Sequence, residues 1–169
     1  MYFQMFQQMK KQLGQLDKWL ATAATYAETK KFDPTNYAGL RLVVDQFDFA
    51  RQVQTACDTA KLGASRLTGK DAPKQDDNEK SIDELRARVA SVVTYLGSFT
   101  AKDFESTATR SVTQPRWEGK TMTGNDYFFE HVVPNFYFHL TTAYALLRQN
   151  GVPVGKRDFL GPLTQHPPK

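Results

Sequence analysis

The sequence has little of what covalent crosslinks and membrane spans require. A single cysteine, Cys57, excludes an internal disulfide, and this is typical of proteins kept in a reducing compartment. No apolar run approaches the ~20 residues of a membrane-spanning helix, and the first residues lack the basic and apolar regions of a signal peptide. We therefore expect a cytoplasmic protein that does not interact with membranes.

The sequence also lacks the common patterns of nucleotide and nucleophilic chemistry. It has no glycine-rich phosphate loop, no paired cysteines and no Ser-His-Asp order. Its net charge of +4 is small, and the basic residues occur as short pairs such as Lys10-Lys11 or beside acids, as with Glu84 and Arg88. Nucleic-acid binding requires basic residues clustered on one face, so we expect no nucleic-acid partner.

What the sequence does contain is the apolar spacing of four helices. Apolar residues recur at steps of three and four over residues 2–29, 47–68, 81–99 and 124–149, which predicts a helix in each range. Asp45 is the expected cap of the second helix, and Ser81 with Glu84 that of the third. The inner face of the second helix consists of small residues, which fits the many aromatic residues of the fourth. Pro134 predicts a kink in the fourth helix.

The connections between these helices indicate their directions. Residues 69–80 form a polar loop that can extend over ~40 Å, so the second and third helices are predicted to be parallel. Asp76, Asp77 and Glu79 in this loop are interpreted as solvated. Residues 107–123 predict a small β-hairpin between the third and fourth helices. Residues 1–169 are thus expected to form one all-α four-helix bundle, with a flexible tail over about 162–169.

Three segments of the sequence are distinctive: FDFARQVQTACDTAKLGASRLTG, PNFYFHLTTAYALLRQNGVP and VGKRDFLG. They resemble a bacterial branch of the DinB-like bundles that is known only as a domain of unknown function. The resemblance covers nearly the whole chain and implies the DinB-like up-down-down-up order. Many DinB-like proteins hold a divalent metal with one histidine on the second helix and two, four residues apart, on the fourth.

The same resemblance locates a degenerate metal site in this chain. His139 matches one ligand on the fourth helix, Asn135 stands in place of the other, and the ligand position on the second helix falls at Gln54 or Thr55. His131 is no substitute, because it starts ~12 Å from His139 along the helix. We therefore expect no cofactor, with a divalent metal bound in an altered way as the alternative.

The residues around His139 form a possible pocket for a small molecule. Its expected members are His139, Asn135, Gln54, Asp58, His131 and Phe136. His139 is predicted to be buried and hydrogen-bonded to Gln54, Asp58 or a hydroxyl group. The aromatic residues over 127–138 either pack beneath the hairpin and tail or form a homodimer interface, and the frequent dimers of DinB-like proteins support a homodimer.

Two functions follow from these observations. The first is a DinB-like bundle that has lost most of its metal site and serves as a non-metal binding or structural protein. The alternative is an enzyme that uses His139 with polar residues of the second helix, either metal-dependent or similar to the thiol transferases among DinB-like proteins. The sequence identifies no substrate or ligand.

Overall fold

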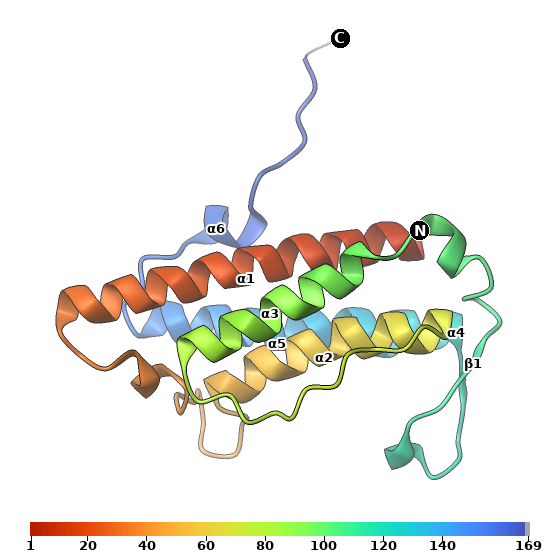
Figure 1. Ribbon diagram of the computed structural model, residues 1–169, viewed down its shortest axis with the longest axis horizontal. Coiled ribbons are helices and arrows are strands. Elements are labelled where there is room, and N and C mark those ends of the chain that lie inside the picture. The colour runs from red at the N-terminus through yellow and green to blue at the C-terminus, as the bar shows by residue number, and fades with distance from the viewer. Residues whose placement is uncertain (168–169) are drawn as a thin grey trace.

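Four long helical stretches form an up-down-down-up bundle in the computed structural model, which describes residues 1–167. They are α1 (Tyr2–Lys30), α2 (Phe49–Thr68), α3 (Ile82–Gly97) and a fourth stretch made of α4 (Gly124–Asp126), η4 (Tyr127–Val132) and α5 (Val133–Gln149). Figure 1 shows that α2 and α3 run in the same direction, opposite to α1 and α5. The predicted bundle and the predicted parallel pair are therefore confirmed.

The helix ends follow from local hydrogen bonds. The side chain of Asp48 accepts a hydrogen bond from the backbone N–H of Arg51 at 2.9 Å, so α2 begins at Phe49 and Asp45 is not its cap. Ser81 and Glu84 form the predicted capping box of α3. Because the Glu84 carboxylate is used in this cap, it does not pair with Arg88 as the sequence suggested.

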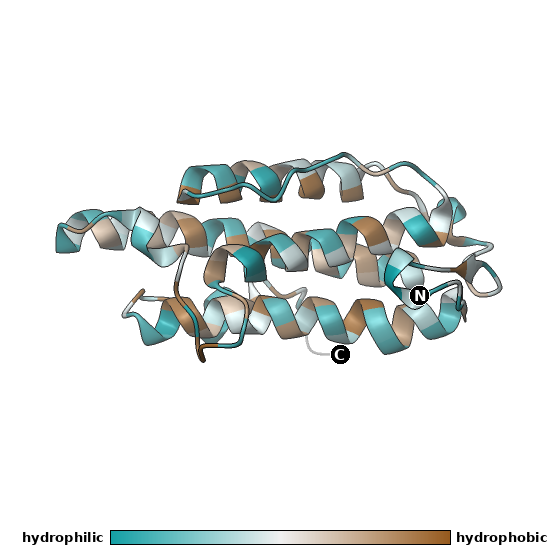
Figure 2. Ribbon diagram, turned by 90° about the horizontal axis from the view of Figure 1, so that it is seen from below, coloured by the Kyte–Doolittle hydropathy of each residue, from teal (hydrophilic) through white to brown (hydrophobic). Residues whose placement is uncertain are grey.

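The core lies between the helices, where their apolar faces meet. Figure 2 shows hydrophobic and hydrophilic residues alternating along each helix, as expected for helices with one buried side. The small residues of α2 allow the fourth stretch to approach closely. A Cβ atom at Gly63 would lie only 2.9 Å from a methyl group of Val132, so the glycine permits this contact.

The fourth stretch is irregular just before Pro134. Segment η4 is π-helical, and its last turn closes with a hydrogen bond from the backbone N–H of Val133 to the carbonyl of Phe128. A π-helical turn is wider than an α-helical one and frequently occurs at functional sites. The departure from regular α-helical geometry therefore lies in the segment just before Pro134, the residue at which the sequence predicts a kink.

Short elements complete the chain. Strands β1 (Ser111–Val112) and β2 (Met122–Thr123) pair antiparallel and confirm the predicted hairpin. The 3₁₀ turns are η1 (Pro34–Tyr37), η2 (Ala101–Phe104) and η3 (Pro115–Trp117). Helix α6 (Lys156–Leu160) lies on α1, where the ring of Phe159 stacks on Trp19 at 5.4 Å.

From residue 161 to residue 167 the chain contains no helix or strand, and residues 168–169 of the predicted tail lie outside the described residues. Within residues 1–167, no helix has both the length and the apolar character that crossing a membrane requires.

Candidate functional site

His139 is buried between α2 and α5, with an exposed fraction of 6%. Its Nδ1 lies 2.7 Å from Oε1 of Gln52, and its ring stacks on Phe47 at 6.1 Å. Since that amide oxygen can only accept, His139 carries its proton on Nδ1. The partner is thus Gln52 rather than the predicted Gln54 or Asp58. Residues two apart on a helix point about 200° apart, so Gln52 and Gln54 lie on different faces of α2.

Asn135 lies one helical turn before His139 but has a different partner. Its Nδ2 donates a hydrogen bond to Oγ1 of Thr59 at 2.7 Å, and Thr59 donates in turn to the carbonyl of Thr55 at 2.7 Å. Phe136, between the two, is fully buried in the hydrophobic core. His139 and Asn135 therefore do not share hydrogen bonds, and Phe136 serves packing.

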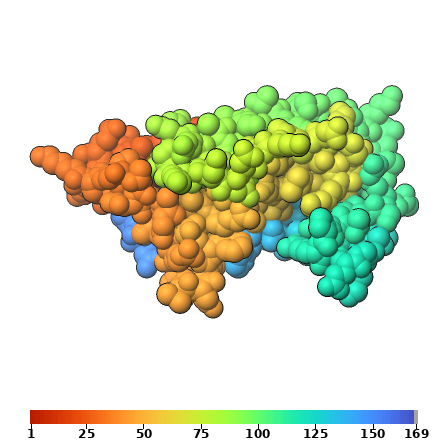
Figure 3. Space-filling model, turned by 60° about the horizontal axis from the view of Figure 1, so that its bottom comes forward, coloured from red at the N-terminus to blue at the C-terminus, as the bar shows by residue number. Residues whose placement is uncertain are grey.

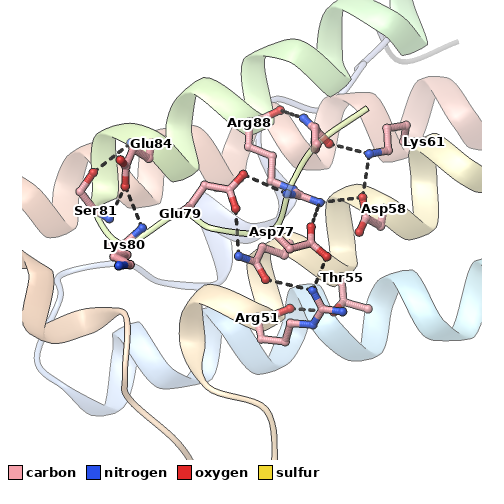
Figure 4. A network of polar contacts seen from close by, with 12 residues as sticks. Arg51, Thr55, Asp58, Lys61, Asp77, Glu79, Lys80, Ser81, Glu84 and Arg88 are labelled. Carbon is pink, nitrogen blue, oxygen red and sulfur yellow. Dashed lines mark hydrogen bonds and ion pairs between the residues drawn. The ribbon is translucent and has the colours of Figure 1, made fainter. Parts of the chain in front are cut away.

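The polar side chains of α2 at Arg51, Gln54 and Asp58 lie against the connection from α2 to α3, residues 69–81, which we call the strap (Figure 4). Gln54 donates from Nε2 to the Glu79 carboxylate at 2.9 Å. Asp58 pairs with Lys61 of its own helix at 2.8 Å and with Arg88 of α3 at 2.7 Å. Gln54 and Asp58 are thus turned away from His139 and help to hold the strap.

Arg88 is the centre of this network, as Figure 4 shows. Its side chain is 1% exposed, and its guanidinium lies 2.7 Å from Asp58, 2.7 Å from Asp77 and 2.9 Å from Glu79. Burial alone would raise the pKa of Glu79, but the hydrogen bond and charge of Arg88 outweigh it and hold that pKa below its ordinary value. The interpretation of Asp77 and Glu79 as solvated is therefore wrong, since both bind a buried arginine.

A cavity of about 270 Å³ lies between α2, η4 and the segment at residues 114–116. Its lining is Thr55, Asp58, Thr59, Leu62, Arg66, Gln114, Pro115, Arg116, Tyr127, His131 and Asn135. We call it the α2–η4 cavity. It brings together Asp58, His131 and Asn135 of the predicted pocket, together with Thr55. His139, Gln54 and Phe136 are not in its lining.

The far wall of the α2–η4 cavity is built from stacked rings on the π-helical segment. The ring of His131 stacks on Tyr127 at 5.3 Å, and Trp117 packs edge-on against both rings. Arg66 of α2 donates from Nη1 to the Tyr127 hydroxyl at 2.9 Å. These contacts fix the positions of Tyr127 and His131.

The protonation of His131 follows from its neighbours. Nη2 of Arg116 contacts Nε2 of the ring, and because a guanidinium can only donate, Nε2 accepts. Burial first, and then the charges of Arg116 and Arg66, lower the pKa of His131 below its ordinary value. The ring is therefore neutral at neutral pH, with its proton on Nδ1.

Sequence reasoning missed several of these residues. Gln52 belongs to a second buried row of α2, made of Gln52, Ala56, Thr59 and Gly63 at steps of four, three and four. The helical spacing of this row could have identified Gln52 as a buried residue from the sequence. Arg66, Gln114, Arg116 and Tyr127 meet only because η4 and the hairpin bring them together, and no spacing in the sequence indicates this.

The residues at the expected metal positions do not fit a divalent ion. His139 donates its Nδ1 proton to Gln52, which leaves Nε2 as its one possible ligand atom, and Asn135 donates from Nδ2 to Thr59, so the expected positions offer a single imidazole nitrogen with no second histidine or carboxylate. Over residues 1–167, no three His, Cys, Asp or Glu side chains lie close enough together to hold a metal. A divalent ion such as zinc normally takes at least three good protein ligands.

The arrangement of the chain is that of a known class of helical bundle. A crystal structure described as a DinB family member from Shewanella denitrificans is 50% identical in sequence, with a TM-score of 0.92. The match covers 96% of this chain and 93% of that one. No match was found among curated proteins. The fold is therefore that of a DinB-like helical bundle.

The sequence also assigns the chain to one family within that class. Residues 1–160 match the family described as a domain of unknown function, DUF1993. The chain belongs to the DUF1993 family.

Proposed function

We propose that this protein binds a small organic molecule in the α2–η4 cavity without a resident metal ion. One observation carries the proposal. Five buried side-chain atoms among residues 1–167 have no hydrogen-bond partner, and two of them, Nε2 of Gln114 and Nδ1 of His131, belong to residues that line this cavity. Buried polar atoms are normally paired, so two unpaired ones beside a single cavity favour a ligand that supplies their partners.

The rigidity of the cavity walls supports the same proposal. Tyr127 and His131 are held by stacking on each other and by the edge-on packing of Trp117, and Asn135 is held by its hydrogen bond to Thr59. A site whose side chains are already in place loses less conformational entropy on binding, which favours affinity for a small ligand.

We do not assign a catalytic role to His139. Burial first, and then the charge of Arg51, lower its pKa to about 4, so the ring is neutral at neutral pH. Its Nδ1 proton is donated to Gln52, and it does not line the α2–η4 cavity. The enzyme alternative built on His139 therefore has less support than a binding function.

A blocking substitution tests the proposal. A library of small organic acids, amides and amines is screened by NMR, with the ring C–H signals of His131 as the readout. Compounds that shift these signals should lose their effect in Leu62→Trp, which fills the cavity, and should keep it in Leu163→Trp, where the residue is 60% exposed in the tail. Compounds that still bind Leu62→Trp with unchanged affinity would show that the ligand site lies elsewhere.

We also propose that two copies of the chain pair through the exposed face of η4 and α5. Figure 3 shows this face in a hollow between two lobes, formed by residues near 41–47 and near 113–120. Phe138 of α5 is 55% exposed, and Phe47, in the chain segment of the first lobe, is 48% exposed. Glu130 and Arg148 are both exposed and lie equally far in sequence from His139. An antiparallel pairing places each Glu130 beside the other copy's Arg148, as a twofold interface requires.

The molar mass in solution tests the pairing. Light scattering after size exclusion should give twice the chain mass for the wild type and for Leu163→Lys, but the chain mass for Phe138→Lys. Glu130→Arg alone should weaken the dimer, and Glu130→Arg combined with Arg148→Glu should restore it. A monomeric wild type at concentrations of about 100 μM would rule the interface out.

A further inference from the structure

We infer that the ligand of the α2–η4 cavity is a small organic carboxylate, bound through Arg66, Arg116, Gln114 and His131. This inference rests on the proposed binding function, because it specifies the chemistry of the same site. It follows from which groups in the lining remain free to bond.

The first argument concerns the unpaired atoms, both of which are donors. Nε2 of Gln114 is an amide nitrogen and can only donate. Nδ1 of His131 carries the ring proton, because Nε2 accepts from Arg116. A ligand that satisfies both atoms must therefore offer hydrogen-bond acceptors.

The second argument concerns charge. Arg66 and Arg116 both line the cavity, and within residues 1–167 neither forms a salt bridge with a carboxylate. Asp58 is the single carboxylate in the lining, and it is already paired with Lys61 and Arg88. The cavity thus presents positive charge that nothing in its lining balances, and this favours an anion over a neutral or cationic ligand.

The number and shape of the donors select among anions. An ionised carboxylate has two oxygens that accept about four hydrogen bonds. Four side chains are available here, two of them planar guanidiniums whose N–H groups match carboxylate geometry. At neutral pH phosphate carries a charge of about −1.5 to −2, and the Asp58 carboxylate in the lining disfavours the additional negative charge, so a singly charged carboxylate fits better.

Three aromatic probes of similar size and different charge, together with inorganic phosphate, test the ligand class. Benzoate, its neutral analogue benzamide, the cation benzylammonium and inorganic phosphate are titrated against the full chain, with the His131 ring signals as the readout. We expect benzoate to bind roughly 10- to 100-fold more tightly than benzamide, the factor that one or two charge-assisted hydrogen bonds provide. Benzylammonium and phosphate should bind more weakly than benzoate.

Substitutions then assign that preference to the arginines. Arg66→Gln and Arg116→Gln should each weaken benzoate binding about tenfold or more and leave benzamide nearly unchanged. Arg157→Gln is the matched control, because Arg157 is exposed on α6 and lies outside the cavity lining. Arg66→Lys keeps the charge and should retain part of the preference, and the thermal unfolding of each variant shows that it is folded.

The outcomes separate this inference from the proposed function. Equal affinity for benzoate and benzamide, or tighter binding of benzylammonium or phosphate, would overturn the carboxylate assignment and leave a ligand site in place. The carboxylate assignment would also be overturned, with a ligand site left in place, if none of the four probes shifts the His131 ring signals while other library compounds do. The effect of those compounds would have to disappear in Leu62→Trp. If no compound shifts His131 at millimolar concentration, both the carboxylate and the binding function are refuted.

Discussion

Replacing Arg88 by methionine would remove the cation that pairs with three carboxylates at once, those of Asp58, Asp77 and Glu79. Arg88 is 1% exposed in its side chain, whereas Asp58, Asp77 and Glu79 are 23%, 33% and 12% exposed. Removing one partner of a buried ion pair reduces stability by about 3–5 kcal/mol. Water partly screens the repulsion among the remaining carboxylates, and methionine keeps much of the buried apolar volume, so we expect a loss near the lower limit, about 3 kcal/mol.

Urea unfolding followed by circular dichroism measures this loss. With an m-value of about 2 kcal/mol per molar urea, the midpoint should fall by about 1.5 M. Arg86→Met is the control on the same helix, since Arg86 pairs with Asp17 and the two side chains are 40% and 36% exposed. Exposed pairs contribute roughly 0–1 kcal/mol, so the control should shift the midpoint by less than about 0.5 M. Equal shifts for the two variants would refute the role assigned to the network.

Three further predictions concern the fourth helical stretch. Phe136→Ala should lower the free energy of unfolding by about 3–5 kcal/mol, since the ring is fully buried, and a loss under about 1 kcal/mol in the same urea assay would contradict its packing. His139 has a pKa of about 4 when folded and about 6.5 when unfolded, so the unfolded chain takes up its proton first as the pH falls. Stability should therefore drop by up to about 3 kcal/mol between pH 6.5 and pH 4, and a slope unchanged in His139→Asn would refute this origin. Elemental analysis of protein purified without a histidine tag should find much less than one equivalent of zinc, nickel or iron, and His139→Ala should not alter the amount; stoichiometric metal lost on that substitution would restore the metalloenzyme hypothesis.

The bundle was predictable because its determinants are local or nearly so. Apolar steps of three and four identify each helix, and the length of the 69–80 loop is enough to indicate that α2 and α3 are parallel. The binding of Arg88 by this loop was not predictable. A polar segment has the same composition whether water or a buried arginine satisfies its carboxylates. Helix spacing pairs Arg88 with Glu84, whereas in the structure Arg88 binds Asp77 and Glu79.

The site was predictable only in part, for a geometric reason. Burial of His139 follows from its position on the inner face of the fourth helix. The hydrogen-bond partner of His139 depends on which face of α2 meets the fourth helix. An error of two residues in the position of that face predicts Gln54 as the partner in place of Gln52. The cavity depends on contacts between segments far apart in sequence, such as Arg66 with Tyr127, and on a π-helical segment that apolar spacing does not reveal.

The π-helical segment has a consequence for how this family can change over evolutionary time. Each π turn holds more residues than an α turn, so deleting a single residue within Tyr127–Val132 would let α4 to α5 form one regular helix. The helix on either side would keep its face, because the wide turn is what accommodates the extra residue, and the change would fall on the side chains within the segment, Tyr127 and His131 among them, which line the cavity. One codon lost or gained here would therefore reshape this wall of the pocket while the core face of α5 stays intact. Family members with an alignment gap at this segment should be bundles with a different cavity wall, which makes the gap a simple criterion for sorting them.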